Sequence, residues 1–492
     1  MRLFNSLTLW GCAGLALHSA AVSLHAETPP ARAAEIELDW KPAPRSNVLP
    51  VAASDDMEPK AGFVKPNRVD FNISTSDVPV LPKAELDNPI VPFEPRKMPQ
   101  VDPNVVRRSA DSGVSYRPAT IEMPPVQEQK SPDLIWGSAE YLRWWTKGNS
   151  MPPLVTTAPI GQLGTLDNPQ TRTVFGEPQT LRNAMNGLRL RGGLWLDECA
   201  TCGIEAGLFR FGQSDQRFRL GGAGDPGIFR PFSNTSSGAP DAEVVALQLP
   251  NSTGGFDPIL SGTVTVRNST DFAGWEANFR KRLCGDQCSN LDFLIGYRYL
   301  RLRDMTSIQE NLTSTDPQEV SAPLGTRINV FDRFETVNTF NGGQVGLTGE
   351  KRWGRWNAGF RTTVALGNTQ QKVSIDGSTQ VITAEGASTT SRGGLLALPS
   401  NIGSYTANRF SVIPEVQANL GYQITENIRV FGGYSFLYWA NVARSGGQID
   451  LNVNPTLLPN NGPPSGANRP AFQLHDTNFW AHGFNIGLEM RW

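Results

Sequence analysis

The sequence predicts an all-β protein: a single antiparallel transmembrane β-barrel of ten strands, with twelve as the alternative, behind a disordered Pro-rich N-terminal leader. Three observations predict this class. The last residues of the chain alternate strictly between apolar and polar side chains, as a strand with one apolar face does. No apolar stretch of 18 residues follows the N-terminus, which excludes spanning helices. The connections between predicted strands are alternately short and long, which is typical of outer-membrane barrels.

The alternating stretch at 480–492 is the clearest predicted strand. Its even positions are all large or apolar: Trp480, His482, Phe484, Ile486, Leu488, Met490 and Trp492. A tilted membrane strand needs roughly 9 to 11 residues, whereas a soluble strand usually ends after about 5 or 6. Leu488, Met490 and the terminal aromatic Trp492 resemble the C-terminal insertion signal of outer-membrane barrels. We therefore expect two partners, outer-membrane lipid and the barrel-insertion machinery.

Composition excludes other classes. The chain has 492 residues and a net charge of −2, so it lacks the basic field of a nucleic-acid-binding protein. Only 39% of its residues are hydrophobic, but it contains 48 Gly, 24 Phe and 12 Trp. Barrels have such a composition because only alternate residues of their strands face lipid.

Residues 1–26 are predicted to be a secretory signal peptide. Arg2 precedes a mostly apolar run to Val22, and small residues lead to Ala26, the expected last residue removed. A lipoprotein signal ending at Cys12 is the weaker alternative, because Trp10 is bulky and the apolar run continues. A signal peptide followed by a transmembrane barrel predicts location in the bacterial outer membrane. Export also permits disulfides.

Residues 27–131 are predicted to be a disordered periplasmic leader. Proline recurs throughout, and no apolar periodicity lasts ten residues. Such a segment cannot bury enough surface to offset its ordering entropy. An extended, polyproline-like linker is the expected form, and a segment that binds a periplasmic or cell-wall partner is the alternative. The barrel then occupies 132–492.

Ten segments of the barrel region place apolar residues on one face and polar residues on the other. These predicted strands are 134–146, 188–197, 203–211, 272–281, 291–299, 338–349, 356–366, 412–422, 428–438 and 480–492.

The connections between these strands form two groups. The short ones are 198–202, 283–288, 350–355 and 423–427, and the long polar ones are 147–186, 212–270, 304–337, 368–410 and 443–477. Short turns on the periplasmic side and long loops outside are typical of outer-membrane barrels, and an even strand count places both ends in the periplasm. The β-like pieces 263–266 and 373–375 within the long loops are the reason for the twelve-strand alternative.

Several spaced motifs resemble a bacterial family of outer-membrane proteins, the beta-barrel porin type, family seven. They are P-P-L-V-T-T at 152–157, the set Asp332, Phe334, Asn338 and Phe340 followed by G-G-Q-V-G-L, and G-Y-S-F-L-Y-W at 433–439 followed by V-A-R-S-G-G-Q-I-D. The resemblance covers about 132–492 and implies an outer-membrane barrel of porin type. It implies no catalytic or ligand-binding residue.

The polar faces of the strands supply candidate lumen-facing residues. They are Arg189, Arg191, Glu205, Glu276, Arg280, Asp292, Arg298, Arg361, Glu415, Arg429, Glu489 and Arg491. These side chains form either a charged, ion-selective constriction or a packed interior held by ion pairs. About eight strands are filled by side chains, whereas 16 to 18 leave an aqueous channel. Ten to twelve strands favour a plugged or narrow lumen.

The four cysteines of the mature chain fall in two predicted short turns. Cys199 and Cys202 occupy one turn, and Cys284 and Cys288 occupy the other. We expect disulfides, either within each turn or between the two turns. A four-thiolate zinc site and free thiols are the alternatives.

No other motif predicts chemistry. The G-x-G-x-x-G match at 222–227 lacks a following helix, so it predicts a loop. A lipid hydrolase using His475 would need a constellation that the sequence does not show. We expect no enzyme activity, no cofactor, no metal site and no nucleic-acid partner. The predicted function is porin-like, narrow or plugged passage of small solutes, and the alternative is a structural or surface-interaction barrel without transport.

Overall fold

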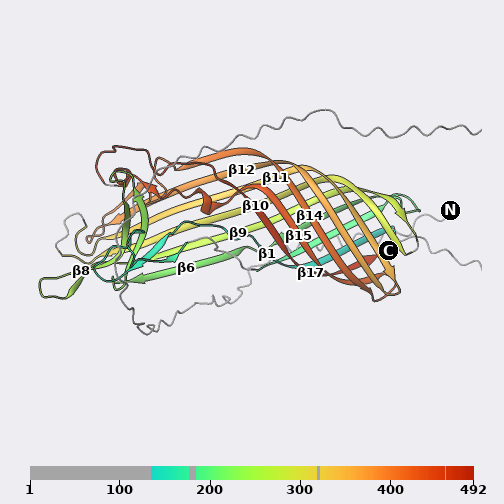
Figure 1. Cartoon of the computed structure of the whole chain (residues 1–492), viewed down its shortest axis with the longest axis horizontal. Coiled ribbons are helices and arrows are strands. Elements are labelled where there is room, and N and C mark those ends of the chain that lie inside the picture. The colour runs from blue at the N-terminus through green and yellow to red at the C-terminus, as the bar shows by residue number, and fades with distance from the viewer. Residues whose placement is uncertain (1–133, 177–183, 287, 318–321, 460) are drawn as a thin grey trace, which may run out of the picture. The chain divides into compact units, whose positions relative to one another are not determined.

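A ring of ten antiparallel strands forms the protein's core architecture (Figure 1). The computed structural model describes residues 134–176, 184–286, 288–317, 322–459 and 461–492, so the predicted signal peptide and leader lie outside the described residues. The ring strands are β1 (Ile135–Thr146), β4 (Ala184–Trp195), β5 (Cys202–Phe211), β9 (Phe256–Gly285), β10 (Ser289–Ser314), β11 (Arg327–Trp353), β12 (Trp356–Ile382), β14 (Gly403–Gln423), β15 (Ile428–Ala443) and β17 (Asp476–Arg491). The all-β class and the ten-strand ring are confirmed.

The first and last strands close the ring. β17 pairs antiparallel with β1 from Trp136↔Arg491 to Thr146↔Ala481. The backbones of Ile135 and Trp492 exchange two hydrogen bonds of 3.0 Å. Closure gives each of the ten ring strands two neighbours in the described part of the chain, which is what a sheet surrounded by lipid requires.

Both chain ends of the ring lie at the end with short turns. Connections of two to six residues join β4 to β5, β9 to β10, β11 to β12 and β14 to β15 at this end. Short turns are periplasmic in outer-membrane barrels, so the opposite end, with the longer connections, is extracellular. No helix among the described residues is long and apolar enough to cross a membrane.

An apolar band surrounds the periplasmic half of the ring. Trp275, Phe360 and Ile486 are 45%, 46% and 58% exposed, so they point outward and are not packed in a core. The band also includes Tyr141, Leu188, Leu190, Ile204, Leu208, Phe279, Ile295, Tyr297, Val345, Leu366, Val416, Leu420, Tyr434, Phe436, Phe484, Leu488 and Met490, all exposed. A soluble monomer rarely exposes so much contiguous apolar surface, so this band is the lipid-facing surface.

Beyond the band, the strands continue as a polar-walled extension. On β10 the outward row changes from Tyr297 and Tyr299 to Arg301 and Arg303, while the inward row stays buried to Ser314. The prediction that 212–270, 304–337 and 368–410 are polar loops is therefore wrong, because much of each is strand. The prediction relied on an apolar outward row, and a strand above the membrane does not need one.

Shorter strands complete the extracellular part. β6 (Ser214–Gly222) pairs with the extension of β9, and β13 (Ser388–Arg392) pairs with the extension of β12. Neither enters the ring, and the β-like pieces 263–266 and 373–375 belong to β9 and β12, so the twelve-strand alternative is wrong.

A small sheet lies at the same extracellular end. It contains β2 (Val155–Ala158), β3 (Arg172–Phe175), β7 (Gly227–Asn234), β8 (Pro240–Pro250) and β16 (Asn452–Val453). β7 is its central strand, because it pairs with β2, with β8 and, in parallel, with β16. Two short 3-10 helices, η2 (Ser445–Gln448) and η3 (Pro455–Leu457), flank β16.

The lipid-facing band can be tested by adding one charge. Ile486 lies midway along the outward row of β17, so Ile486→Arg is expected to lower the free energy of unfolding by about 2–4 kcal/mol. Gln309→Arg, on the exposed outer wall of the extension, should change it by less than about 0.5 kcal/mol. Urea unfolding in lipid vesicles measures both variants. Equal effects would show that Ile486 does not face lipid.

Candidate functional site

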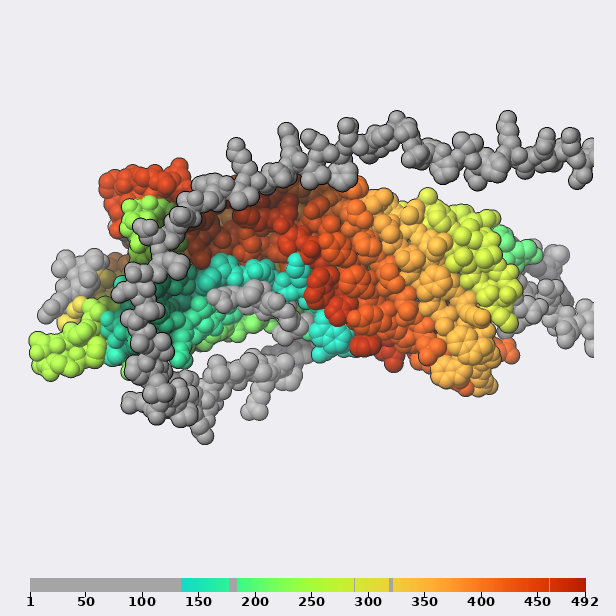
Figure 2. Space-filling view, viewed as in Figure 1, coloured from blue at the N-terminus to red at the C-terminus, as the bar shows by residue number. Residues whose placement is uncertain are grey.

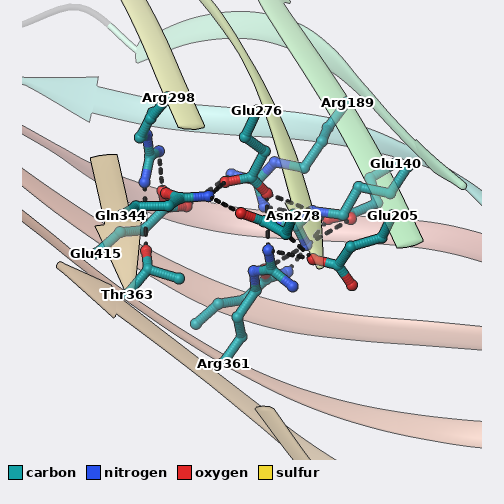
Figure 3. Close-up of polar contacts among 12 residues, drawn as sticks. Glu140, Arg189, Glu205, Glu276, Asn278, Arg298, Gln344, Arg361, Thr363 and Glu415 are labelled. Carbon is teal, nitrogen blue, oxygen red and sulfur yellow. Dashed lines mark hydrogen bonds and ion pairs between the residues drawn. The ribbon is translucent and has the colours of Figure 1, made fainter. Parts of the chain in front are cut away.

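A belt of charged side chains crosses the lumen within the membrane-spanning half of the ring (Figure 3). The ion-pair belt comprises four arginines and four glutamates: Glu140, Arg189, Arg191, Glu205, Glu276, Arg298, Arg361 and Glu415. They come from β1, β4, β5, β9, β10, β12 and β14. The belt is formally neutral and largely shielded from water, with each of these side chains at most 13% exposed.

Arg361 is the best-paired cation of the belt. Its Nη2 lies 2.6 Å from Glu205 Oε1 and 2.9 Å from Glu276 Oε1. Asn278 Nδ2 also donates to Glu205 Oε1, at 3.0 Å, and Gln344 Nε2 donates to Glu276 Oε2, at 3.0 Å. Such charge-assisted hydrogen bonds to fixed partners offset part of the desolvation cost of the carboxylates.

Glu415 on β14 pairs with two further belt arginines, one on β10 and one on β4. Arg298 on β10 forms an ion pair with Glu415 on β14, and its Nη1 donates to Thr363 Oγ1 at 3.3 Å. Arg189 on β4 reaches Glu140 and the same Glu415, both at 3.5 Å. The belt therefore combines contacts across the lumen with contacts between the neighbouring strands β1 and β4, where Glu140 pairs with Arg189 and Arg191.

Glycine makes room for the belt at two inward positions. A Cβ on Gly296 would lie 2.3 Å from Asn278 Oδ1 and 2.1 Å from the Ala277 carbonyl oxygen, so no larger residue fits without displacing that strand. A Cβ on Gly207 would lie 3.1 Å from Arg191 Cγ. These glycines let the long charged side chains of the neighbouring strands fill the lumen.

A layer of packed apolar side chains lies inside the ring on the extracellular side of the belt. This aromatic layer consists of Leu142, Trp144, Met185, Phe209, Phe211, Phe272, Leu300, Leu302, Phe340, Ala365, Ile413, Leu437, Trp439, Val442, Phe479 and Ala481. Every ring strand contributes, and Phe272 contacts Phe209, Phe479 and Trp439 at centroid distances of 5.0, 5.2 and 6.4 Å. The Arg189 guanidinium lies 5.1 Å from the Trp144 ring and joins the belt to this layer.

The chain itself folds into the lumen above the aromatic layer. Arg444 forms a buried ion pair with Asp304 on β10, and Asn338 Nδ2 donates to the Ala443 carbonyl oxygen at 2.8 Å. Ser445, in η2, accepts a hydrogen bond from Asn149 Nδ2 at 2.9 Å. We call residues 443–448 the plug segment, because these contacts hold it inside the ring.

A second apolar core fills the extension above the plug segment. It includes Leu154, which precedes β2, Val155 from β2, Phe334 from β11, and the segment 395–398. Within the extension, Arg230 on β7 pairs with Glu310 on β10 and with Asp332 on β11. Burial raises the pKa of Glu310 even though Arg230 opposes the shift. Asp332 Oδ1 also accepts hydrogen bonds from the Leu396 and Ala397 amides, at 3.1 and 2.8 Å.

The periplasmic mouth below the belt contains a polar cavity of about 410 Å³. Two clusters of ion pairs lie at its rim. Arg429 and Arg491 share Glu350, at 2.9 and 3.1 Å, and Glu489, at 2.5 and 2.6 Å. Across the mouth, Asp292 accepts from Arg280 and Arg282, and both guanidiniums lie within 5.0 Å of the Trp195 ring.

The structure places the candidate lumen-facing residues at two levels. Seven belong to the ion-pair belt: Arg189, Arg191, Glu205, Glu276, Arg298, Arg361 and Glu415. Five lie at the periplasmic mouth: Arg280, Asp292, Arg429, Glu489 and Arg491. Sequence reasoning missed Glu140 and the whole aromatic layer. The sequence did contain a signal for the aromatic layer, because the inward rows that carry Glu205 and Arg298 continue with the apolar residues Phe209, Leu300 and Leu302.

The four cysteines of the described residues lie at the periplasmic end as separate thiols in the structure. Cys202 begins β5, and Lys281 Nζ on the neighbouring β9 lies 3.1 Å from its sulfur. Cys199, Cys284 and Cys288 are exposed. Among the residues that the structure describes, no group of three or more His, Cys, Asp or Glu side chains is arranged to hold a metal ion.

The remaining candidates lie at the surface. Leu488, Met490 and Trp492 are exposed on the lipid-facing row at the end of the chain. His482 lies on the same row, where Nδ1 is 2.5 Å from the Tyr434 hydroxyl, and His475 is exposed before β17. Gly224 lies in the connection between β6 and β7, while Gly222 ends β6 and Gly227 begins β7, so only the middle of the 222–227 match is a loop.

A closed antiparallel ring with an outer apolar band, short turns at one end and a charged inner row defines an outer-membrane β-barrel protein. The family described as "Putative beta barrel porin-7" matches residues 136–492. The chain belongs to this family, as the motifs in the sequence predicted. A comparison with curated proteins finds no match.

Several solved outer-membrane barrels are similar to this chain at low identity. The outer membrane protease OmpT from Escherichia coli is 12% identical, with 73% of this chain and 97% of that chain covered and a TM-score of 0.34. A Pseudomonas aeruginosa FadL homologue is 7% identical, with 73% and 90% covered and a TM-score of 0.19. An anion-selective porin from Comamonas acidovorans is 8% identical, with 73% and 98% covered and a TM-score of 0.15.

The ion-pair belt can be tested by removing its best-paired cation. Arg361→Leu leaves the buried Glu205 and Glu276 without that partner, so the free energy of unfolding should fall by about 3–5 kcal/mol. Arg409→Leu removes an exposed ion pair to Asp476 and should cost less than about 1 kcal/mol. Urea titrations in the same detergent compare the two, and a small effect of Arg361→Leu would contradict the belt.

Proposed function

We propose that this protein is a plugged outer-membrane barrel whose main work is done by its extracellular extension, with no open aqueous passage in the resting state. The observation that carries the proposal is the aromatic layer, in which side chains from all ten ring strands meet across the lumen. The belt below it and the plug segment above it add two further closed levels. This corresponds to the structural or surface-interaction function rather than to free diffusion, and to a role without catalysis.

The dimensions of the ring support a plugged lumen. Ten strands lie close to the eight that side chains fill completely and far from the 16 to 18 that surround an aqueous channel. The extension supports the surface role. Its strands continue well beyond the lipid-facing band and support the small extracellular sheet around β7. A structure that only conducted solutes would not require this additional wall.

Gated, porin-like passage of small solutes is the second candidate function. The cavity at the periplasmic mouth favours it, because about 410 Å³ is enough to admit a small molecule below the belt. The plug segment is held by polar contacts, including the Arg444–Asp304 ion pair. Polar groups can exchange a protein partner for water at a smaller net cost than an apolar core can be exposed, so this segment can move. Passage would still require the aromatic layer to separate.

Conductance in planar bilayers tests the two functions. Purified wild-type protein is expected to show no reproducible channel steps. The triple variant Phe272→Ala, Phe340→Ala and Trp439→Ala removes the large rings at the centre of the aromatic layer. Water and ions can then enter a constriction that was dry, so the ion conductance is expected to rise by roughly tenfold or more. The matched variant Trp275→Ala, Phe360→Ala and Phe484→Ala removes three rings from the lipid face and should leave conductance unchanged.

Regular wild-type steps of one amplitude would establish an open passage and remove the plugged-barrel proposal. Steps that occur only after the Arg444–Asp304 pair is broken, as in Asp304→Asn, would favour gated passage over permanent closure.

Export, oxidation and insertion complete the proposal. We propose that residues 1–26 are removed, that the cysteines form disulfides within or between the two periplasmic turns, and that Leu488, Met490 and Trp492 direct insertion. A periplasmic or cell-wall partner of residues 27–131 belongs to the same proposal. Export leaves the turns in an oxidising compartment, which favours cystine.

One membrane preparation tests these three points. Mass spectrometry without reduction should find a chain that begins at Glu27 with its four thiols linked, and four alkylated cysteines would contradict the disulfides.

In membranes prepared in the same way, Trp492→Gly should reach the membrane more slowly than Arg491→Gln. Equal yields would remove Trp492 from the insertion signal.

A further inference from the structure

One side of the outer wall, directly above the lipid-facing band, carries an excess of arginine. β9, β10 and β11 lie side by side there, and β5 and β6 pair with successive parts of the other edge of β9. The registers of these strands define five successive outward rows. The lowest row runs from Arg210 through Ala273 and Arg301 to Thr339, and the highest runs from Arg219 through Thr265 and Gln309 to Phe331. Figure 1 shows β6 beside the extension of β9.

Charge in these five rows is unbalanced. They contain seven arginines and three acids: Arg210, Arg217, Arg219, Arg267, Arg301, Arg303 and Arg333, with Asp215, Asp271 and Glu335. We call this set the arginine surface. In the register that continues onto β12 and β14, the same rows contain one lysine, Lys372, and one acid, Asp376. The excess therefore does not continue onto β12 and β14.

The three arginines nearest the membrane have spare hydrogen-bonding capacity. Arg210 is 77% exposed, and its nearest acid, Asp271, is 4.0 Å away. Arg301 is exposed and forms no ion pair within the described part of the chain. Arg303 lies 2.7 Å from Glu335, but Glu335 also pairs with Arg333, so one carboxylate serves two guanidiniums.

These arginines lie at the level of lipid headgroups. The row below Arg210 and Arg301 contains Trp275 and Tyr299, whose rings stack at 5.9 Å, and Tyr297 follows on the next row down. Tryptophan and tyrosine mark the interface between hydrocarbon and headgroups. Two residues along a strand span roughly 7 Å, which brings the guanidiniums to the height of headgroup phosphates on the extracellular side.

We propose that the arginine surface binds the phosphate groups of anionic glycolipid in the outer leaflet of the membrane. A guanidinium presents a planar fork that matches phosphate oxygens, and Arg210 and Arg301, two strands apart, are separated by roughly 10 Å and can contact two phosphates of one headgroup. The aromatic rings below pack against the acyl chains of the same lipid. The lipid then fixes this side of the barrel and the height of the extension above the membrane.

Lipid binding by purified protein in neutral detergent tests the proposal. The probe is bisphosphorylated lipid A, and native mass spectrometry measures the bound fraction. The variant Arg210→Gln, Arg301→Gln, Arg303→Gln is expected to bind it roughly a hundredfold more weakly, because each basic residue near an anionic lipid surface contributes about a factor of five. All three side chains are solvent-facing, so the variant should unfold at the same urea concentration as the wild type.

A matched variant separates position from net charge. Lys372→Gln, Arg392→Gln, Arg409→Gln also removes three exposed positive charges, on β12, β13 and β14, and should bind within about threefold of the wild type. Dephosphorylated lipid A should not be retained, and an equimolar amount of inorganic phosphate should not displace the lipid.

Three results would overturn the proposal: equal binding by the arginine variant, an equal loss in the matched variant, or retention of the dephosphorylated lipid. Displacement by inorganic phosphate alone would assign the surface to free phosphate rather than to lipid.

Discussion

The pairing of arginine with glutamate inside the ring is the interaction on which the closed lumen depends. Arg189, Arg191, Arg298 and Arg361 face four glutamates in a space with little water. Charges in such a place are costly unless each is paired and hydrogen-bonded. Because the belt is neutral and several of its pairs cross the lumen, the inner face of the barrel can be both polar and densely packed at this level.

Several residues of the motifs that resemble the family lie in the packed interior of the barrel. Phe340 belongs to the aromatic layer, Asn338 holds the Ala443 backbone, and Asp332 pairs with Arg230. The V-A-R-S-G-G-Q-I-D motif contains the plug segment, whose Arg444 pairs with Asp304. Gly446 in this motif has no room for a side chain, because a Cβ would lie 2.1 Å from the Ser150 carbonyl oxygen.

The sequence predicted the ring because lipid imposes an apolar outward row on every strand. All ten ring strands were located from that row, and the C-terminal strand with Ile486 and Leu488 was the clearest. The apolar outward row ends where the strands leave the membrane on the extracellular side. The strand extensions beyond that level lack this pattern and were therefore predicted as loops. On β10, for example, the alternation is lost at Arg301 although the strand continues to Ser314.

The charges of the lumen could be predicted, but their partners could not. Alternation places Arg361 and Glu205 on inward rows, whereas their contact depends on strand stagger and on the width of the ring. The aromatic layer was missed for a related reason: Phe209 and Leu300 follow charged residues on the same inward row, and the prediction treated that row as uniformly polar. The plug segment could not be predicted because its contacts join residues far apart in sequence, such as Asn338 and Ala443.

The central claim is that side chains close the lumen between its two mouths. Thiol labelling tests it most directly, with single cysteines placed in a chain whose four native cysteines are replaced by serine. Ala365→Cys lies in the aromatic layer and Ser138→Cys lines the periplasmic cavity. A small charged methanethiosulfonate reagent should modify Ser138→Cys within minutes and leave Ala365→Cys unmodified until the protein is unfolded. Rapid modification of Ala365→Cys in the folded barrel would contradict the closed lumen.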